Sequence, residues 1–222
     1  MLFRSHDGIP AGRIAVVHDG IDVDKIQHRP ALDIHAEYWL PHGVPVIVNV
    51  GAMVGHKGQK FLIDAMPLVL REVPDAHLVI FGEGELRAPL EKQVKQLNLT
   101  RRVRMPGFRE DVLSLMKSAD LFVMSSVTEG LGSAVLDAMA MGHAVVGTTA
   151  GGIAEAVVDH ETGLLVEPGD AKALARAIVT LLKDAPLRTQ YGAAGRARVA
   201  AHFGVDRLVD GTLEAYQALA RP

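Results

Sequence analysis

Short, almost continuously apolar runs alternate along this chain with stretches in which apolar residues recur every three to four positions. Runs such as Leu78–Phe81 are typical of strands buried on both faces, as in a parallel sheet covered by helices. They predict six or seven strands, at Ile14–Val17, Pro45–Val50, His77–Phe81, Arg102–Met105, Asp120–Met124, Ala144–Gly147 and Gly163–Val166.

The segments between these runs have helical spacing. Phe61–Leu70 and Leu86–Leu97 repeat with a period near 3.6 residues, and Pro67 predicts a kink in the first of them. After Val166 the pattern becomes wholly helical. Alternating strands and helices followed by helices alone predict a doubly wound parallel α/β sheet with a helical C-terminal tail. The predicted tail helices are Asp170–Lys183, Pro186–Ala201 and Val205–Ala220.

Three parts of the chain differ in pattern. Residues 1–44 contain one candidate strand and turn and then an irregular stretch, 19–44, with Pro30 and Pro41, which we interpret as a linker. Residues 45–204 contain the α/β alternation, and we expect one Rossmann-like domain there. Residues 205–222 form an amphipathic helix with an apolar stripe, which we expect to cross to a neighbouring domain and, in its absence, to promote self-association. The stripe consists of Val205, Leu208, Val209, Leu213, Tyr216 and Leu219.

The composition excludes several classes of protein. The chain has no Cys, which removes disulfides, thiolate metal sites and a Cys nucleophile together. Its formal charge of −3 argues against a protein built to coat nucleic acid. No stretch has the length of a signal peptide or of the roughly 18 apolar residues that span a membrane, although contact with a membrane surface stays compatible with the sequence. We therefore expect a cytoplasmic protein.

Three histidines recur every seven residues, at His28, His35 and His42. On one continuous helix they would share a face and could hold a metal ion. Pro30 and Pro41 exclude such a helix, and no HxxxH or HExxH spacing is present. We interpret these histidines as accidental surface residues and predict no metal site.

Two glycine-rich loops follow predicted strands. In Gly51–Gly58 the backbone could approach a ligand closely, and Lys57 could offer its charge to a phosphate. The spacing is neither that of a P-loop nor that of a dinucleotide-binding loop, so a plain turn with a solvated Lys is the alternative. The second loop, Gly82–Gly84, by itself indicates only a tight turn.

A third loop, Ser125–Gly130, leads from a strand into a helix predicted to start near Leu131. The first N–H groups of such a helix, at Gly132, Ser133 and Ala134, would form an anion site. Glu129 before the helix and Asp137 inside it suit sugar hydroxyls on either side of a diphosphate. The alternative is that Glu129 caps the helix and Asp137 has an ordinary polar partner.

Together these loops resemble the C-terminal domain of glycosyltransferase family 4 enzymes, which have the GT-B fold. The resemblance runs from about residue 10 to the end of the chain, and the order and spacing of its motifs make it specific. An initial turn, Val16–Asp22, resembles the family's turn between domains. The other matching stretches are Val50–Ala65, His77–Leu90, Arg102–Ala119, Glu129–Gly147, Gly151–Glu155 and Thr162–Asp170.

The resemblance implies a role for individual residues. Glu129 would be the catalytic residue and contact the donor sugar, and Asp137, where the family has Glu, would hold the ribose. Lys57 would bind the diphosphate without the Arg that the family commonly has at position 52, where this chain has Ala. The base would lie against the loop after the strand ending at Met105. The other implied contacts are Gly51, Gly82, Leu131, Gly132, Ser133 and Ala134 with the donor, and Phe108 and Arg109 with the base.

The resemblance also implies the reaction, which is transfer of a sugar from a nucleoside-diphosphate sugar to a hydroxyl acceptor with retention of configuration and without a metal cofactor. We expect the family's N-terminal acceptor domain to be missing from this chain, and we therefore expect the chain alone to be inactive. Two alternatives stay open. One is a non-catalytic nucleotide-sugar-binding module or one part of a split enzyme. The other is a GT-B enzyme such as a UDP-sugar 2-epimerase, which the spacing of Glu129 and Asp137 disfavours.

Overall fold

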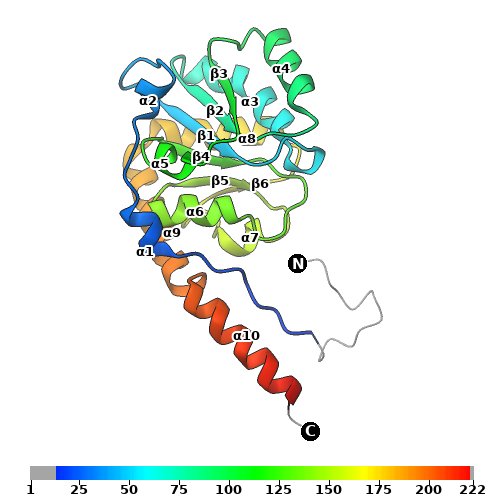
Figure 1. The fold of residues 1–222 in the computed structure, drawn as a ribbon. Coiled ribbons are helices and arrows are strands. Elements are labelled where there is room, and N and C mark those ends of the chain that lie inside the picture. The colour runs from blue at the N-terminus through cyan, green and yellow to red at the C-terminus, as the bar shows by residue number, and fades with distance from the viewer. Residues whose placement is uncertain (1–13, 221–222) are drawn as a thin grey trace.

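The computed structural model describes residues 14–220 and contains one six-stranded parallel sheet (Figure 1). The strand order is β3-β2-β1-β4-β5-β6, in which the chain first builds outward from β1 to β3 and then returns to add β4 on the other side of β1. This order is that of the doubly wound fold, as the sequence predicted. The strands are β1 (Val46–Val50), β2 (His77–Phe81), β3 (Val103–Gly107), β4 (Leu121–Met124), β5 (Val145–Thr148) and β6 (Gly163–Val166).

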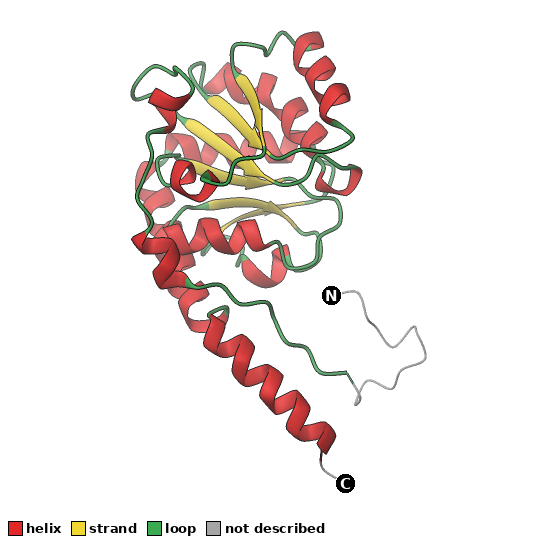
Figure 2. Cartoon of the chain, viewed as in Figure 1, coloured by secondary structure: helices red, strands yellow, loops and turns green. Residues whose placement is uncertain are grey.

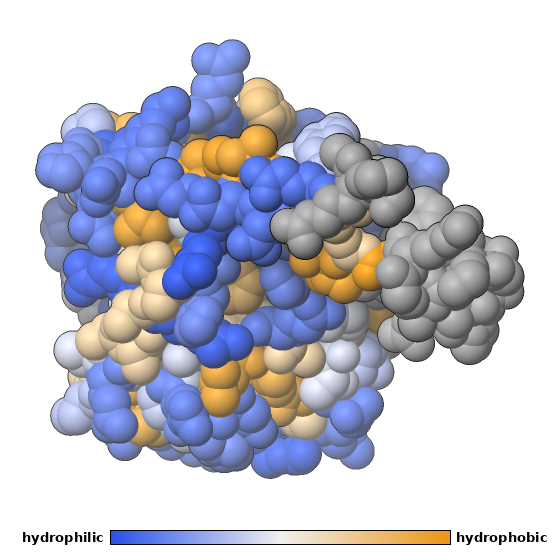
Figure 3. All heavy atoms as spheres, turned by 90° about the horizontal axis from the view of Figure 1, so that it is seen from below, coloured by the Kyte–Doolittle hydropathy of each residue, from blue (hydrophilic) through white to orange (hydrophobic). Residues whose placement is uncertain are grey.

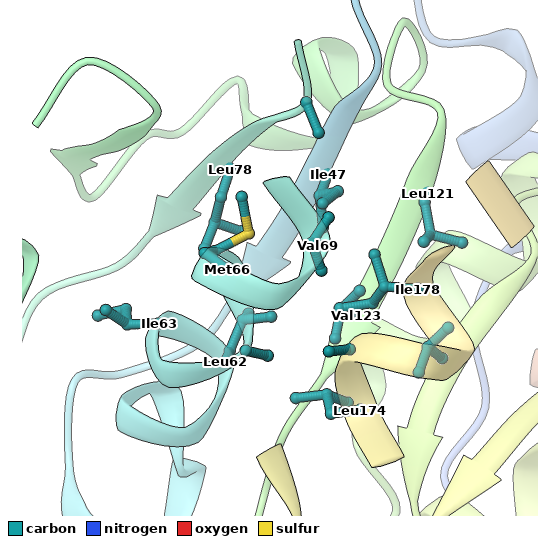
Figure 4. Close-up of a cluster of buried hydrophobic side chains, with 14 of the residues drawn as sticks. Ile47, Leu62, Ile63, Met66, Val69, Leu78, Leu121, Val123, Leu174 and Ile178 are labelled. Carbon is teal, nitrogen blue, oxygen red and sulfur yellow. The ribbon is translucent and has the colours of Figure 1, made fainter. Parts of the chain in front are cut away.

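Helices cover both faces of the sheet (Figure 2). On one face lie α3 (Gln59–Glu72), α4 (Arg87–Gln96) and α8 (Ala171–Lys183). Figure 4 shows side chains of α3 and α8 gathered over Ile47, Leu78 and Val123. The opposite face is covered by α5 (Val112–Met116), α6 (Ser133–Met141), α7 (Ile153–Ala156) and α9 (Ala185–His202).

Alternate side chains of each strand enter opposite cores. In β1, Ile47 packs under α3, whereas Val46 and Val48 belong to the cluster on the other face. Successive strand side chains point to opposite faces, so a strand covered on both sides is apolar at most positions on both faces. Pro106 lies in β3, at the edge of the sheet, where its missing N–H breaks no internal ladder.

The predicted strand Ile14–Val17 is wrong, since residues 14–20 form no strand. The segment runs beside α10 (Val205–Ala220) and α7 instead. His18 contacts Glu155 of α7, and Val17 lies close to Gly211 of α10. An apolar run becomes a strand only beside a partner backbone, and the nearest backbone here belongs to helices.

Residues 19–44 are more ordered than the linker that their sequence suggested. They contain α1 (Val23–His28) and α2 (Ile34–Glu37), each with an Asp side chain that accepts a hydrogen bond from the first turn. Ile26 and Ile34 are buried and fix both helices to the sheet domain. The segment was misjudged because its apolar residues are few and the helices are too short for a repeat.

The C-terminal tail is helical as predicted, with α8, α9 and α10 in succession, and α3 continues through Pro67. In Figure 1, α10 leaves the α/β body and projects away from it. The face that includes this end of the molecule is mostly hydrophilic, with hydrophobic patches between the polar atoms (Figure 3). The exposed apolar side chains of α10 are Val205, Val209, Leu213 and Tyr216, whereas the side chain of Leu219 lies outside the described residues.

Candidate functional site

The strand order reverses between β1 and β4, and the loops after these two strands separate there. In open parallel sheets this switch point is where ligands bind, because the two loops diverge and leave a crevice at the carboxyl ends. The loop after β1 contains Gly51 and the short 3₁₀ helix η3 (Gly55–Lys57). The loop after β4 contains Glu129 and leads into α6. The candidate residues from separate sequence motifs therefore meet at one end of the sheet.

The glycine loops after β1 and β2 pack directly on each other. A Cβ atom at Gly82 would overlap the carbonyl oxygen of Gly51, and one at Gly84 would overlap the backbone of Met53. Gln59, almost fully buried, donates a hydrogen bond of 2.9 Å to the carbonyl of Ala52. These contacts explain both glycines of the second loop structurally. Sequence reasoning missed Gln59, which secures the first loop.

Lys57 and Glu129 form an ion pair, with Nζ 2.6 Å from Oε2. Their side chains are only 18% and 10% exposed. The Ser126 hydroxyl donates to the same oxygen at 2.9 Å. Lys57 is therefore not the solvated side chain of a plain turn. The two residues predicted to bind different parts of one ligand lie in direct contact with each other.

Helix α6 begins at Ser133, two residues later than predicted, after Gly132 with a left-handed backbone (φ 77°). No side chain caps it, so the alternative in which Glu129 is a cap is wrong. Within the described part of the chain, the N–H groups of Gly132, Ser133 and Ala134 donate to no protein oxygen. Unpaired N–H groups at the start of a helix attract an anion. Leu131, predicted as the start of the helix, lies in the preceding loop.

Asp137 lies one turn further along α6 and is partly buried. Burial raises the pKa of its carboxyl to about 6, against a smaller opposing effect of the Arg29 charge. Among the described residues the carboxyl has no hydrogen-bond partner, and the buried Nε of Arg29 has none either. The alternative of an ordinary polar partner for Asp137 is therefore not supported. Arg29 lies in the segment interpreted as a linker, so the sequence pattern did not identify it as a site residue.

A cavity of about 410 Å³ opens beside Gly51 and Gly82. Its size is typical of small-molecule sites, and its lining includes Phe108 and Arg109 from the loop after β3 and Val112 at the start of α5. The Phe108 ring is exposed over it. The predicted base-binding residues thus border the same cavity as the glycine loops.

Arg109 itself is held by carboxylates. Its guanidinium makes two hydrogen bonds of 2.8 Å to Asp111 and a further one to Glu37 of α2. These partners raise the pKa of Arg109, which stays charged. Arg109 therefore shapes the cavity wall and ties α2 to it, and its charge is already balanced. Like Arg29, Glu37 is a residue of the segment interpreted as a linker that contributes to the site and that the sequence analysis did not identify.

No group of three His, Asp or Glu side chains able to hold a metal ion occurs among residues 14–220. His35 and His42 stack on each other, and a ring nitrogen of His35 bonds the Val44 backbone oxygen. His35 is thus a packed residue and not the accidental surface histidine expected. Within the described helices, none is long and apolar enough to cross a membrane.

Comparison with known proteins agrees with this geometry. Residues 32–198 match the family described as glycosyl transferases group 1. The chain is 34% identical over 174 residues to the lipopolysaccharide core biosynthesis glycosyltransferase LpsE of Rhizobium meliloti, covering 78% of this chain and 50% of LpsE. It is 38% identical over 168 residues to a GDP-mannose-dependent mannosyltransferase of Corynebacterium glutamicum that acts on a monoacylated phosphatidylinositol monomannoside, covering 72% of this chain and 43% of the relative.

Two solved structures are similar as well. HepE of Anabaena in complex with UDP superimposes with a TM-score of 0.87 at 26% identity, covering 96% of this chain and 60% of HepE. The C-terminal domain of a group 1 glycosyl transferase, LpcC of Francisella tularensis, gives a TM-score of 0.74 at 30% identity, covering 84% of this chain and all of that structure.

The fold and the site thus define a doubly wound domain of the kind found in the C-terminal half of GT-B glycosyltransferases. The chain belongs to the glycosyl transferases group 1 family. It spans about half the length of the two curated relatives described above.

The raised pKa of Asp137 predicts a pH-dependent stability. Since the folded pKa of about 6 exceeds the usual value of 3.8, folding is penalised above pH 6, and the penalty fades as the pH falls toward 4. We expect Asp137→Asn to raise the free energy of unfolding by about 1–2 kcal/mol at pH 7.5 and by little near pH 4. Urea unfolding at both pH values measures this. Asp210→Asn, on exposed α10, is the control, and an equal effect of Asp137→Asn at both pH values would contradict the assignment.

Proposed function

We propose that this chain is the donor-binding half of a retaining glycosyltransferase of family 4. In this proposal the full enzyme transfers a sugar from a nucleoside-diphosphate sugar to a hydroxyl acceptor. The observation that carries the proposal is the buried contact of Lys57 with Glu129 beside the free N-terminus of α6. The Lys57 cation and the unpaired N–H groups suit the diphosphate of such a donor, and the Glu129 carboxylate suits its sugar.

The diphosphate would lie at the N-terminus of α6. There the N–H groups of Ser133 and Ala134 and the ammonium of Lys57 would meet it, with Gly51 and Gly132 allowing close approach. These groups would stabilise the negative charge that develops on the leaving diphosphate, and they need no rearrangement to do so. Ala52, exposed beside the cavity, offers no second cation. Most of the electrostatic contribution would therefore come from Lys57 and the helix.

Glu129 would accept hydrogen bonds from the sugar, and Asp137 would hold the ribose hydroxyls. The base would occupy the cavity bordered by Phe108 and Arg109. No metal ion has a role in this proposal, because the helix N-terminus and Lys57 neutralise the diphosphate. The nucleotide sugars of such reactions are made in the cytoplasm, where we place the protein.

A second candidate is a nucleotide-sugar-binding module without activity, or one part of a split enzyme. The observation that favours it is that all residues proposed to bind the donor lie in the single domain described here. Catalysis between two domains needs both walls of the cleft, to position the acceptor and to exclude water. A binding module needs only the wall described here.

The first test compares two ligands. A thermal-shift screen with UDP-, GDP- and ADP-sugars selects the nucleotide, and calorimetric titration then measures the free diphosphate and the nucleotide sugar. We expect Lys57→Ala to weaken both about ten- to hundredfold, since each loses one charge-assisted contact. We expect Glu129→Gln to weaken only the nucleotide sugar, and to leave the diphosphate unchanged or bound more tightly, because Lys57 is released from its partner.

Matched controls remove the same charges elsewhere. Lys95→Ala on α4 and Glu161→Gln in the loop before β6 change exposed residues away from the crevice. Both should bind as the original chain does. Equal losses of both ligands in Glu129→Gln would contradict the assignment of Glu129 to the sugar.

The second test is turnover. We expect the chain alone to bind a nucleoside diphosphate weakly and to transfer no sugar, because one wall of the proposed cleft is supplied by another domain. Addition of the N-terminal half of LpsE provides such a wall from a relative. The measurement is release of nucleoside diphosphate in the presence of a hydroxyl acceptor. Robust transfer by the chain alone would show that the second domain is not needed.

The third test concerns the apolar stripe of α10. We propose that it packs against the acceptor domain in the longer enzyme, and against a second copy when this chain is alone. Leu213 and Tyr216 are 53% and 68% exposed, and contiguous exposed apolar surface tends to become an interface. Light scattering should show a mass that rises with concentration.

The double variant Val209→Glu, Leu213→Glu should remain monomeric, since it places two charges in the stripe. Arg207→Glu makes the same net change of charge on the opposite face of α10 and should still associate. An original chain that stays monomeric at high concentration would disprove self-association.

A further inference from the structure

Two buried serine hydroxyls, of Ser125 and Ser126, lie side by side at the carboxyl end of β4, and each donates to a different residue of the Lys57–Glu129 pair. The Ser125 hydroxyl donates to the backbone oxygen of Lys57 at 3.2 Å. The Ser126 hydroxyl donates to the Glu129 carboxylate at 2.9 Å. One serine therefore holds the backbone that bears the cation, and the other holds the functional group of the carboxylate directly.

The Glu129 carboxylate is held entirely through one oxygen. Lys57 Nζ and Ser126 Oγ both donate to Oε2, and no donor among the described residues reaches Oε1. Oε1 is thus the oxygen left for an external hydroxyl. Two donors on Oε2 fix the direction in which Oε1 points.

Lys57 cannot hold this position throughout the proposed reaction. Its ammonium is the side-chain cation proposed for the diphosphate, and turning toward the phosphates lengthens or breaks its 2.6 Å contact with Glu129. Once that happens, Ser126 is the remaining donor to the carboxylate. Without a donor to hold it, the carboxylate would rotate about its side-chain bonds and lose the orientation that contact with the sugar requires.

We propose that Ser126 is a positioning residue that keeps Glu129 directed at the donor sugar after Lys57 has turned to the diphosphate. This inference rests on the proposed function and assigns to Ser126 a role in the protein with the donor bound. The residue is 0% exposed, so water cannot easily replace its hydroxyl. Its backbone oxygen accepts a 2.6 Å hydrogen bond from buried Thr148 of β5, which fixes Ser126 itself.

Ser125 provides an internal comparison, because it is equally buried and loses the same oxygen atom on substitution. We expect Ser126→Ala to weaken binding of the nucleotide sugar about five- to twentyfold while the diphosphate changes less than twofold. We expect Ser125→Ala to change both ligands by the same factor, because it acts through the Lys57 backbone. The probes are UDP with UDP-glucose and GDP with GDP-mannose, measured by calorimetric titration.

Two further measurements distinguish destabilisation of the whole domain from loss of the Glu129 orientation. Ser126→Thr keeps the hydroxyl and should restore the selectivity for the nucleotide sugar even if the added methyl group lowers the unfolding midpoint. In the absence of ligand, Ser126→Ala and Glu129→Gln should shift the urea midpoint by less together than the sum of their separate shifts, because they break one shared contact.

The outcomes are distinct. Equal effects of Ser126→Ala on both ligands, or additive midpoint shifts with Glu129→Gln, overturn the positioning role and leave the proposed function standing. Failure of the original chain to bind either pair of probes, together with no binding in the thermal-shift screen of UDP-, GDP- and ADP-sugars, overturns the proposed function and this inference with it.

Discussion

The parallel pairing of β1 with β4 is the constraint on which the rest of the structure depends. Ile47 and Val48 of β1 lie opposite Leu121 and Phe122 of β4, although more than seventy positions separate the two strands along the chain. Between them the chain has already built β2 and β3 on the other side of β1. This reversal makes the loops after β1 and β4 diverge, and it brings Lys57 and Glu129 together at the crevice.

Around this crevice the protein has few charges, and most of them have a defined partner. Lys57 is balanced by Glu129 and Arg109 by Asp111 and Glu37, while Asp137 is partly buried, has no hydrogen-bond partner among the described residues and has a raised pKa. Unpaired groups are costly in a protein interior, and they concentrate where a ligand is to satisfy them. The N–H groups at the start of α6 are also unpaired among the described residues, so a ligand could satisfy them in the same way. This distribution supports the proposed site better than any single motif does.

The sequence predicted the sheet almost completely because its information there is local. A strand covered on both faces is apolar at most positions, and the runs at β1, β2, β4 and β5 follow this pattern, with single buried polar residues at Asn49, His77 and Thr148. The helices of the tail were equally predictable from their 3.6-residue period. The prediction failed at Ile14–Val17, where an apolar run lies beside helices and has no strand to pair with. It also failed for α1 and α2, which are too short to show a period.

The sequence by itself determined the fold class, the family resemblance and the loops expected to gather at one edge of the sheet, since strand–helix alternation and motif spacing are local patterns. Only the tertiary structure decided which side chains touch. The contact of Lys57 with Glu129, the support from Ser126 and the approach of Glu37 to Arg109 join residues whose positions along the chain reveal no relation. Such contacts depend on where separate elements are placed by packing. In the sequence Glu129 is a predicted sugar contact with a helix cap as the alternative, and only the fold shows that its partner is the largely buried cation of Lys57.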